Sequence, residues 1–207
     1  MSENDREERL GWFDEVYRNA GDNPDAVPWQ NTGPHPGLAY WAETARDHGG
    51  RAIDVGCGLG ENAEFLARLG YAVTAFDLST SAVDWARKRF PDSSVSYRQA
   101  DLFALPGEWT AAFDLVNEIY TLQALPADMR QDALARIAAL VAPGGRILVV
   151  CMGREEGEDP GENPPFPLAR AEIERFVRAG LIETAFEDIV LGENERRHFI
   201  AVYSRPL

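Results

Sequence analysis

The segment 54–60, Asp-Val-Gly-Cys-Gly-Leu-Gly, most constrains what this chain can fold into. It follows a short apolar run at 52–55 and precedes a helical pattern that begins near Glu61. Glycines at a strand-to-helix junction allow a tight turn and let a ligand approach the backbone at the helix N-terminus. This glycine loop therefore predicts an α/β fold in which an adenosine cofactor is held at the end of a strand.

Acidic residues around the glycine loop narrow the choice of ligand. Asp54 precedes the glycines, and Glu61 and Glu64 occupy the first turn of the following helix. A dinucleotide site must seat a diphosphate at that helix N-terminus, where these carboxylates would repel it. A ligand with a positive centre removes the conflict, because Asp54 could neutralise it while the loop amides accept its carboxylate. We therefore expect a cationic cofactor, and a nicotinamide-dependent oxidoreductase is the alternative.

Two further carboxylates follow the next two predicted strands. Asp77 lies about 20 residues beyond the loop, where a carboxylate can accept hydrogen bonds from both hydroxyls of a ribose. Asp101 follows the third strand beside Leu102, and an acceptor next to an apolar residue suits the amino group and ring face of adenine. The alternative for Asp77 is a structural role next to the helix N-cap at Ser79.

Short apolar β-rich runs alternate with amphipathic helical stretches from residue 51 onward. This alternation is typical of βαβ units that build a mostly parallel sheet. Strands are predicted at 52–55, 72–76, 95–98, 113–117 and 146–151, and helices at 61–69, 80–90 and 127–141. Pro143-Gly144-Gly145 should end the last of these helices and turn the chain into the fifth strand.

The two ends of the chain add further elements to this core. A helix is predicted at 168–179, followed by two antiparallel strands at 182–191 and 197–204. Ahead of the sheet we expect a helix at 12–19, an extended segment at 27–36 and a helix at 37–48. The chain of 207 residues is thus predicted to be one domain. Residues 1–50 provide N-terminal helices and a lid segment, 51–151 the cofactor-binding core, and 152–207 a substrate loop, helix and strand pair.

Composition limits the compartment and the partners. Two cysteines, Cys57 and Cys151, are too few for a disulfide framework, and the acidic N-terminus lacks the basic start and apolar run of a secretory signal. We expect a cytoplasmic protein without a membrane span. The formal net charge of −14 repels nucleic-acid phosphates and anionic membranes. No residue spacing suggests a metal site, and the expected partner is a small-molecule substrate of a monomer or homodimer.

Motifs between residues 53 and 150 occur in the order of a known family. The glycine loop, Phe76-Asp77-Leu78-Ser79, Ala100-Asp101-Leu102, the segment 113–117 and Ala142-Pro143-Gly144-Gly145-Arg146 resemble five successive motifs of the class I S-adenosylmethionine-dependent methyltransferases. The resemblance implies a Rossmann-like, seven-stranded, mostly parallel sheet with the last strand antiparallel and helices on both faces. It implies S-adenosylmethionine bound by Asp54, Gly56, Cys57, Gly58, Gly60, Asn62, Asp77, Leu78, Asp101, Leu102 and Asn117. Cys57 is then a small residue under the loop rather than a nucleophile.

Segments that flank this core resemble the thiopurine, thiol and tellurite-type small-molecule methyltransferases. Val27-Pro28-Trp29-Gln30 and the segment 34–38 look like the N-terminal part of those enzymes, where a Pro-Trp element packs over the cofactor. The segment 164–168 is similar to their late substrate loop. The hypothesis is that Trp29 and the residues to Leu38 form a lid that contacts the cofactor, while Tyr120, Arg154 and Phe166 line the acceptor pocket. Alternatively, Trp29 is a core residue and the proline loop a solvated connector.

Two side chains are candidates for orienting or deprotonating the acceptor, His35 and Tyr120. His35 lies between two prolines in an extended segment, where a structural role is the alternative. Tyr120 ends the segment Asn117-Glu118-Ile119-Tyr120, which departs from the Asn/Asp-Pro-Pro-Tyr pattern of enzymes that methylate nucleobase or glutamine nitrogens. We therefore predict methyl transfer to a small molecule, with a thiol or another soft nucleophile as candidate acceptor. The remaining alternatives are the oxidoreductase and a non-catalytic, cofactor-binding partner subunit.

Overall fold

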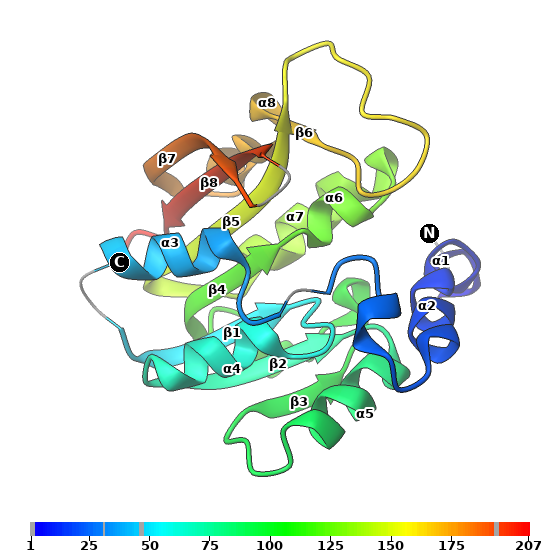
Figure 1. The fold of residues 1–207 in the computed structure, drawn as a ribbon. Coiled ribbons are helices and arrows are strands. Elements are labelled where there is room, and N and C mark those ends of the chain that lie inside the picture. The colour runs from blue at the N-terminus through cyan, green and yellow to red at the C-terminus, as the bar shows by residue number, and fades with distance from the viewer. Residues whose placement is uncertain (1–2, 31, 46–47, 193–194) are drawn as a thin grey trace.

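The alternating strands and helices assemble into one twisted sheet with helices on both faces (Figure 1). The computed structural model describes residues 3–30, 32–45, 48–192 and 195–207. The seven main strands are β1 (Gly50–Val55), β2 (Tyr71–Asp77), β3 (Ser96–Gln99), β4 (Phe113–Ile119), β5 (Val141–Arg154), β7 (Ile182–Leu191) and β8 (Arg196–Ser204). They lie in the order β3-β2-β1-β4-β5-β8-β7.

Strand directions confirm the predicted sheet. β1 pairs in parallel with β2 and β4, β2 pairs in parallel with β3, and β4 pairs in parallel with β5. The last strand, β8, is antiparallel to both β5 and β7. A two-residue strand, β6 (Leu168–Ala169), also pairs with the end of β5, and its residues were predicted to be helical.

The longer helices divide between the two faces of the sheet. Apolar side chains of α3 (Pro36–Thr44), α4 (Glu61–Arg68) and α5 (Thr80–Arg89) bury one face, and those of α7 (Ala127–Ala139), α8 (Arg170–Ile173) and α9 (Arg175–Arg178) bury the other. Along β5, Leu148 and Val150 face the first group whereas Ile147 and Val149 face the second, because successive side chains of a strand alternate. No helix within the described ranges is long and apolar enough to cross a membrane.

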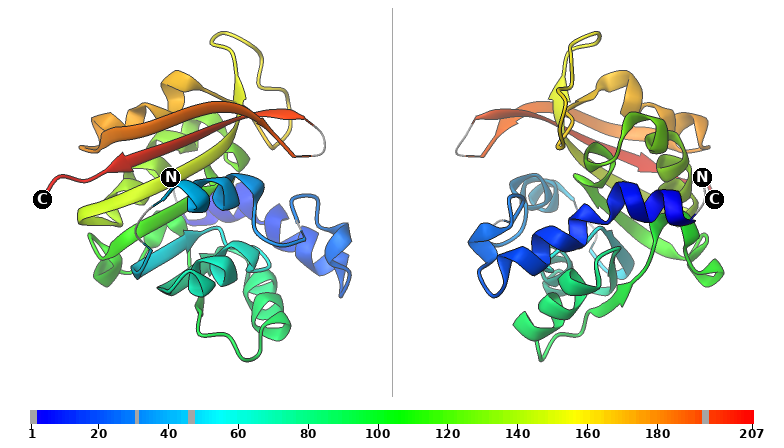
Figure 2. Two further views of the ribbon diagram at one scale, coloured as in Figure 1. Left: turned by 60° about the vertical axis from the view of Figure 1, so that its left-hand side comes forward. Right: turned by 90° about the vertical axis from the view of Figure 1, so that its right-hand side faces the viewer.

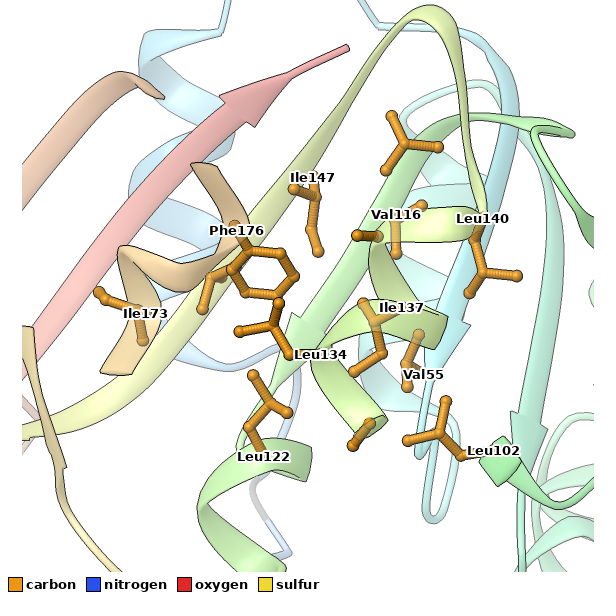
Figure 3. Packing of buried hydrophobic residues seen from close by; sticks show 14 of the residues in the cluster. Val55, Leu102, Val116, Leu122, Leu134, Ile137, Leu140, Ile147, Ile173 and Phe176 are labelled. Atoms are coloured by element: carbon orange, nitrogen blue, oxygen red, sulfur yellow. The ribbon is translucent and has the colours of Figure 1, made fainter. Parts of the chain in front are cut away.

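Helix α7 and the two short helices after it pack closely on the sheet. Figure 3 shows Leu134 and Ile137 of α7 and Phe176 of α9 lying against Val116 of β4 and Ile147 of β5. All five side chains are nearly or fully inaccessible to water. Each buried aliphatic or aromatic side chain of this size contributes roughly 1.5–3 kcal/mol of transfer free energy. This packing gives a rigid base for the strand ends that carry the site.

Two N-terminal helices lie across the carboxyl ends of the parallel strands. α1 (Glu3–Leu10) and α2 (Trp12–Ala20) cross in front of the other elements in the right-hand view of Figure 2. The Asp14 carboxylate of α2 accepts hydrogen bonds from Ser79 Oγ at 2.6 Å and Ser81 N at 3.1 Å, which ties α2 to the start of α5. The helix predicted at 12–19 is therefore present, and α1 was not predicted.

The turn predicted at 143–145 lies inside β5 rather than before it. α7 ends at Ala139, two residues earlier than expected, and Val141 already pairs with Phe113 of β4. The register then shifts, so that Leu115 pairs with Arg146. The Pro-Gly-Gly sequence thus forms a bulge in the strand, because the backbone N–H of Gly144 donates to the carbonyl of Arg205, which directly follows β8, and keeps this segment beside β8.

Two other predicted helices have different bounds. The helix expected at 168–179 begins only at Arg170 and is divided at Glu174, which keeps helical dihedral angles between α8 and α9. The helix expected at 37–48 ends at Thr44, because Ala45 adopts an extended ψ of 128°. Residues 46 and 47 lie outside the described residues.

Candidate active site

The glycine loop turns tightly between β1 and α4, and its neighbours leave no room for side chains. Gly56 and Gly60 have φ values of 66° and 94°, a region that glycine adopts without strain. A Cβ atom at Gly56 would lie 2.6 Å from Thr121 Oγ1, and one at Gly60 would lie 2.5 Å from Tyr97 Oη. These two positions therefore require glycine for both backbone conformation and space.

Asp77 is buried at the end of β2 and faces the glycine loop. Its Oδ2 accepts a hydrogen bond from Gly58 N at 2.9 Å, and its Oδ1 accepts one from Ser79 N at 2.9 Å. Burial raises the pKa of this carboxyl group, and the bonds from Ser79 and Gly58 oppose that effect. Each oxygen keeps a lone pair for a ligand hydroxyl. Asp77 thus has both the structural role near Ser79 and the geometry of the predicted ribose acceptor.

Asp54 and Asn117 lie beneath the glycine loop and do not line the cavity described below. Asn117 Nδ2 donates to Asp54 Oδ1 at 2.7 Å, while Asp54 Oδ2 has no hydrogen-bond partner among the described residues. Burial raises the pKa of Asp54 to about 7. Both were predicted to bind the cofactor. In the structure the backbone of the glycine loop lies between these two side chains and the cavity. A charge on Asp54 would therefore act on a ligand across the loop, without direct contact.

The two other acidic residues near the loop have polar partners, and that of Glu61 is a cation. Glu61 forms an ion pair with Arg89 of α5, with Arg89 Nη1 2.8 Å from Glu61 Oε2. Glu64 accepts a hydrogen bond from Tyr97 Oη at 2.7 Å. The pair with Arg89 corrects the interpretation from sequence for Glu61, whereas the neutral Tyr97 hydroxyl does not balance a charge on Glu64. The electrostatic preference for a cationic ligand therefore rests on Glu64 and mainly on Asp54, whose free oxygen has no partner to balance a charge.

Aromatic side chains of α2 and Trp29 form a cover over the glycine loop. Trp29 Nε1 donates to Tyr17 Oη at 2.7 Å, and the Trp29 ring contacts Trp12 and Phe13 edge-on at centroid distances of 6.0 and 6.1 Å. A Cβ atom on Gly58 would lie 3.1 Å from Tyr17 Oη. The lid predicted from Trp29 onward is thus anchored on α2, a contribution that the sequence pattern did not reveal.

Asp101 lies at the start of the 3₁₀ helix η2 (Leu102–Ala104), at the far end of the site. Its Oδ1 accepts from Phe103 N at 2.8 Å, and its Oδ2 lies 3.0 Å from Arg6 Nε of α1. The side chains of this ion pair are 17% and 23% exposed, so it is partly shielded from water. The predicted adenine acceptor is therefore also the point where α1 is attached to the sheet.

One cavity of about 440 Å³ joins the glycine loop, the carboxylates and the aromatic cover, a volume within the range of small-molecule sites. Its described lining includes twelve of the predicted site residues: Trp29, His35, Gly56, Cys57, Gly58, Gly60, Asn62, Asp77, Leu78, Asp101, Leu102 and Tyr120. Burial raises the pKa of the Cys57 thiol, which keeps it protonated and supports its interpretation as a small packing residue.

The opposite end of the cavity is built from β4, β5 and the β7–β8 hairpin. Tyr120 follows β4, Met152 lies near the end of β5, and Arg196 begins β8. His35 closes this end from the N-cap of α3, where its backbone N donates to Asn62 Oδ1 at 2.8 Å. The rings of His35 and Tyr120 meet edge-on at 4.7 Å. Both predicted catalytic candidates therefore face the same space.

Arg154 and Phe166, predicted to contact the substrate, do not line this cavity. Arg154 Nη2 pairs with Glu172 Oε2 at 2.8 Å, and its Nε donates to the Pro167 carbonyl at 3.0 Å. The Phe166 ring packs under the Arg130 guanidinium at 5.2 Å. Both residues hold the ends of the 155–167 loop against α7 and α8. This loop reaches the cavity instead through Pro164 and Pro165.

Several cavity residues were missed by sequence reasoning. They include Phe13 and Tyr17 of α2, and Met152 and Arg196 at the acceptor end. Behind the lining, His198 of β8 contacts Tyr120 and is 4% exposed. A histidine in an otherwise apolar strand run, Phe199 to Val202, was the one signal that could have pointed to it. No group of three His, Cys, Asp or Glu side chains with metal-binding geometry occurs in the part of the chain that the structure describes.

Comparisons with known proteins agree with this geometry. A family model described as a methyltransferase domain matches residues 52–145. The chain is 29% identical over 176 residues to probable thiol methyltransferase 2 of Arabidopsis thaliana, which covers 82% of this chain and 73% of that protein. It is 38% identical over 122 residues to the ubiquinone biosynthesis O-methyltransferase of Xanthomonas campestris pv. campestris (strain B100), covering 56% of this chain and spanning 49% of that relative's length.

Among solved structures, the fold is similar to that of 1,6-didemethyltoxoflavin-N1-methyltransferase from Burkholderia thailandensis. The TM-score is 0.74 at 20% identity, over 100% of this chain and 92% of that chain. At this identity the likeness concerns the fold. It extends the match beyond residues 52–145 to the N-terminal helices and the C-terminal strand pair.

Strand order, glycine loop and the carboxylate that ends β2 place this protein among the α/β enzymes that hold an adenosine cofactor across parallel strand ends. Within that class, the match to a methyltransferase domain and the similarity to curated methyltransferases show an S-adenosylmethionine-dependent methyltransferase, and its sheet has the fold of the class I enzymes. Its methyl donor is S-adenosylmethionine and its acceptor is a small molecule. These matches remove the oxidoreductase alternative.

The described residues fit this cofactor. The unpartnered Oδ2 of Asp54 suits a ligand with net positive charge, and the buried Asp77 carboxylate suits ribose hydroxyls. When bound, the cofactor supplies a methyl group that its sulfonium makes electrophilic. The protein then has to hold the acceptor in line with this methyl group and exclude water, because orientation and desolvation supply most of the acceleration.

Proposed function

We propose that the methyl acceptor is a small thiol or another soft nucleophile, bound at the end of the cavity next to Tyr120 and His35. The observation that carries this proposal is the composition of that end. Ile119, Met152, Pro164 and Pro165 give it a largely apolar surface, Arg196 is its charged side chain, and its described lining has no carboxylate. A polarisable thiol is compatible with such a site, because it needs little solvation before it reacts.

Amine acceptors fit this end less well. A small alkylamine is protonated at neutral pH, and a buried ammonium group needs a carboxylate or several acceptors to replace its water. The carboxylates in the described lining, Glu61, Asp77 and Asp101, come from the end of the cavity formed by α4, β2 and β3. A thiol ionises near pH 8.5, so modest assistance makes it a nucleophile. The similarity to a probable thiol methyltransferase supports the same choice.

Hydrogen-bond donors at this end determine how such an acceptor would be oriented. His35 Nδ1 accepts the backbone N–H of Gly37 at 3.1 Å, so a neutral ring carries its proton on Nε2. Burial, helped by the nearby His198, lowers the pKa of His35 to about 4, which keeps the ring neutral near pH 7. His35 thus offers a donor to the reacting atom. This geometry favours orientation by His35 over deprotonation.

An acceptor screen tests the proposal. Purified protein is incubated with S-adenosylmethionine and with hydrosulfide, small alkyl and aromatic thiols, phenols or primary amines, and methylated products and S-adenosylhomocysteine are quantified by mass spectrometry. We expect kcat/KM to be highest for thiols. Methylation of phenols or amines with no methylation of thiols contradicts the acceptor class. Cofactor binding without any methylated product would favour the non-catalytic partner subunit.

A further inference from the structure

We propose that His198 of β8 is a positioning residue and the final proton acceptor for methyl transfer, and that it acts through the hydroxyl of Tyr120. This inference deepens the proposed function, because it requires an acceptor that loses a proton before or during transfer. His198 does not line the cavity itself. Tyr120 does, so the tyrosine is the group that would touch the acceptor.

Hydrogen bonds on both ring nitrogens fix the protonation of His198. Its Nδ1 lies 2.7 Å from the Arg196 carbonyl oxygen, which can only accept, so Nδ1 carries a proton. Its Nε2 lies 2.6 Å from Tyr120 Oη. In the neutral ring Nε2 is an acceptor, and the tyrosine hydroxyl therefore donates to it. The lone pairs of the Tyr120 oxygen remain for a proton from the cavity.

Backbone geometry holds Tyr120 in a conformation that is costly for a side chain other than glycine. Its φ is 68°, in the left-handed region, directly between the end of β4 and α6 (Thr121–Ala124). The Tyr120 N–H donates to the Val150 carbonyl at 3.1 Å, and its carbonyl accepts from Ala124 N at 3.2 Å. Such strain persists where the surroundings over-determine the conformation, as they often do at functional sites.

The elements packed around His198 present few other ionisable groups. His35 comes from the N-cap of α3, with its ring 5.7 Å from that of His198, and Arg196 comes from β8 itself. On the same face of the sheet, β5 places Met152 and β7 places Ile189 opposite His198, with Glu187 exposed two residues along β7. Glu118 of β4 points to the other face, since it pairs with Val149.

This environment makes His198 a neutral base at working pH. Burial lowers the pKa of His198, an effect that its bond to the Arg196 carbonyl partly opposes and the Arg196 charge reinforces. A neutral imidazole with a free lone pair on Nε2 can take a proton as soon as one arrives at Tyr120. The two rings lie nearly parallel, 10° apart, so the hydroxyl and Nε2 stay aligned.

Two protons move in this transfer, and no atom or charge is lost. The thiol proton moves to Tyr120 Oη while the original hydroxyl proton moves to His198 Nε2, which leaves a thiolate, an intact tyrosine and an imidazolium. A sulfur lone pair of the thiolate forms the new bond to the methyl carbon. The electrons of the broken methyl–sulfonium bond remain on the cofactor sulfur as its charge is neutralised. His198 afterwards releases its proton to water.

Two thiols of different acidity separate a proton-accepting role from a structural one. His198→Gln keeps an acceptor for the Tyr120 hydroxyl but cannot take a proton. With an alkyl thiol that is mostly protonated at pH 8, we expect kcat to fall by about 100-fold. With an aromatic thiol that is already ionised, we expect a change of less than about 3-fold. An equal loss with both thiols, or no loss with either, would overturn the proposal.

The pH profile gives a second readout that a structural role would not change. In the wild type, kcat/KM for the alkyl thiol should level off above the pKa of His198. In His198→Gln it should continue to rise about tenfold per pH unit towards the pKa of the thiol. Tyr120→Phe should show the same difference between the two thiols. The double variant should be as active with the alkyl thiol as the less active of the two single variants, because both residues act in one hydrogen-bonded relay.

Controls keep this test independent of folding and of the acceptor class. His48→Gln changes a histidine whose Nε2 lies 3.2 Å from the Ala42 carbonyl, outside the cavity lining, and should leave both reactions unchanged. The affinity of each variant for S-adenosylhomocysteine, measured by calorimetry, should stay within about twofold. If the screen identifies phenols instead of thiols, an ionised and a protonated phenol serve the same test, so each proposal can fail alone.

Discussion

At the scale of single residues, Asp77 combines cofactor geometry with loop stability. Its two oxygens accept the backbone N–H groups of Gly58 and Ser79, so the carboxylate shapes the glycine loop before any ligand arrives. Sequence reasoning could place Asp77 at the end of β2 from spacing. It could not show that the glycine loop depends on it, because the bond from Gly58 joins residues 19 positions apart.

Replacing Asp77 should therefore affect both binding and folding. We expect Asp77→Ala to weaken binding of S-adenosylhomocysteine by about 1.5–3 kcal/mol through lost charged hydrogen bonds, and to cost about 1–2 kcal/mol of stability through two unpaired amides. Calorimetry and thermal unfolding measure the two effects. Asp84→Ala on the exposed face of α5 removes the same charge and should change neither. Unchanged affinity in Asp77→Ala would remove Asp77 from the site.

His35 offers a residue-scale test of donor against base. Asparagine at this helix N-cap can still accept the Gly37 N–H but loses the imidazole Nε2–H. We expect His35→Asn to lower kcat by about tenfold, the value of one hydrogen bond of about 1.4 kcal/mol. The pH profile should keep its shape, because the pKa of His35 is already near 4. A shift of the acidic limb in this variant would instead identify His35 as the base.

At the scale of elements, the regular part of the sheet followed from the sequence and the irregular parts did not. Short continuous apolar runs between the helical stretches located each main strand, because a strand that is buried on both faces of the sheet carries apolar side chains on both faces. The bulge at 143–145 was read as a turn, since Pro-Gly-Gly breaks helices and strands alike. Its place in β5 depends on the chain near Arg205, which no local pattern encodes.

The N-terminal elements and the acceptor end show the same limit. α1 is mainly polar, and it is held by the Arg6–Asp101 and Arg9–Asp128 pairs, which span 95 and 119 positions of sequence. His198 meets Tyr120 only because β8 lies beside β5 in the sheet. Motif spacing could predict the cofactor end, which is formed by consecutive strand ends. The acceptor end joins elements that are distant in sequence.

Glu118 at the end of β4 gives an element-scale prediction about pH. It is fully buried, its Oε1 accepts from Leu122 N of α6 at 2.9 Å, and its Oε2 has no partner among the described residues. Burial raises its pKa to about 7. Because the folded pKa lies above the unfolded value, the stabilising effect of the neutral form is complete at low pH and is lost as pH rises towards 7.

Glu118→Gln should therefore stabilise the protein in a pH-dependent way. The amide resembles the protonated acid, so the variant and the wild type should unfold at similar temperatures near pH 5. At pH 8 the wild type carries the cost of a buried anion, and the variant should be more stable by about 1–3 kcal/mol. Denaturant unfolding at both pH values measures this, with the exposed Glu108→Gln as control. A difference that does not grow with pH contradicts the assignment.

At the scale of the whole molecule, the net charge of the protein and the contacts inside the cavity act on different steps of ligand binding. The net charge of −14 produces a negative field around the protein, whereas described ion pairs hold Glu61 and Asp101 at the cavity. Long-range attraction is therefore available to a cation approaching from solution, while the contacts inside the cavity are mostly apolar or paired. The field acts on association, and the local contacts determine which ligand stays bound.

The two forms of the cofactor make this effect measurable. S-adenosylmethionine carries a net charge of +1, and S-adenosylhomocysteine is a neutral zwitterion that makes the same contacts apart from the methyl group and sulfonium charge. Raising ionic strength from about 10 to 300 mM shortens the Debye length from roughly 30 Å to below 10 Å. We expect the association rate constant of S-adenosylmethionine to fall by about 3–10-fold over this range and that of S-adenosylhomocysteine to change by less than twofold. Stopped-flow fluorescence can follow both ligands, because Trp12 and Trp29 line the cavity. Equal salt dependence for both ligands would mean that the acidic surface does not attract the donor, and that its charge is recognised only at Asp54.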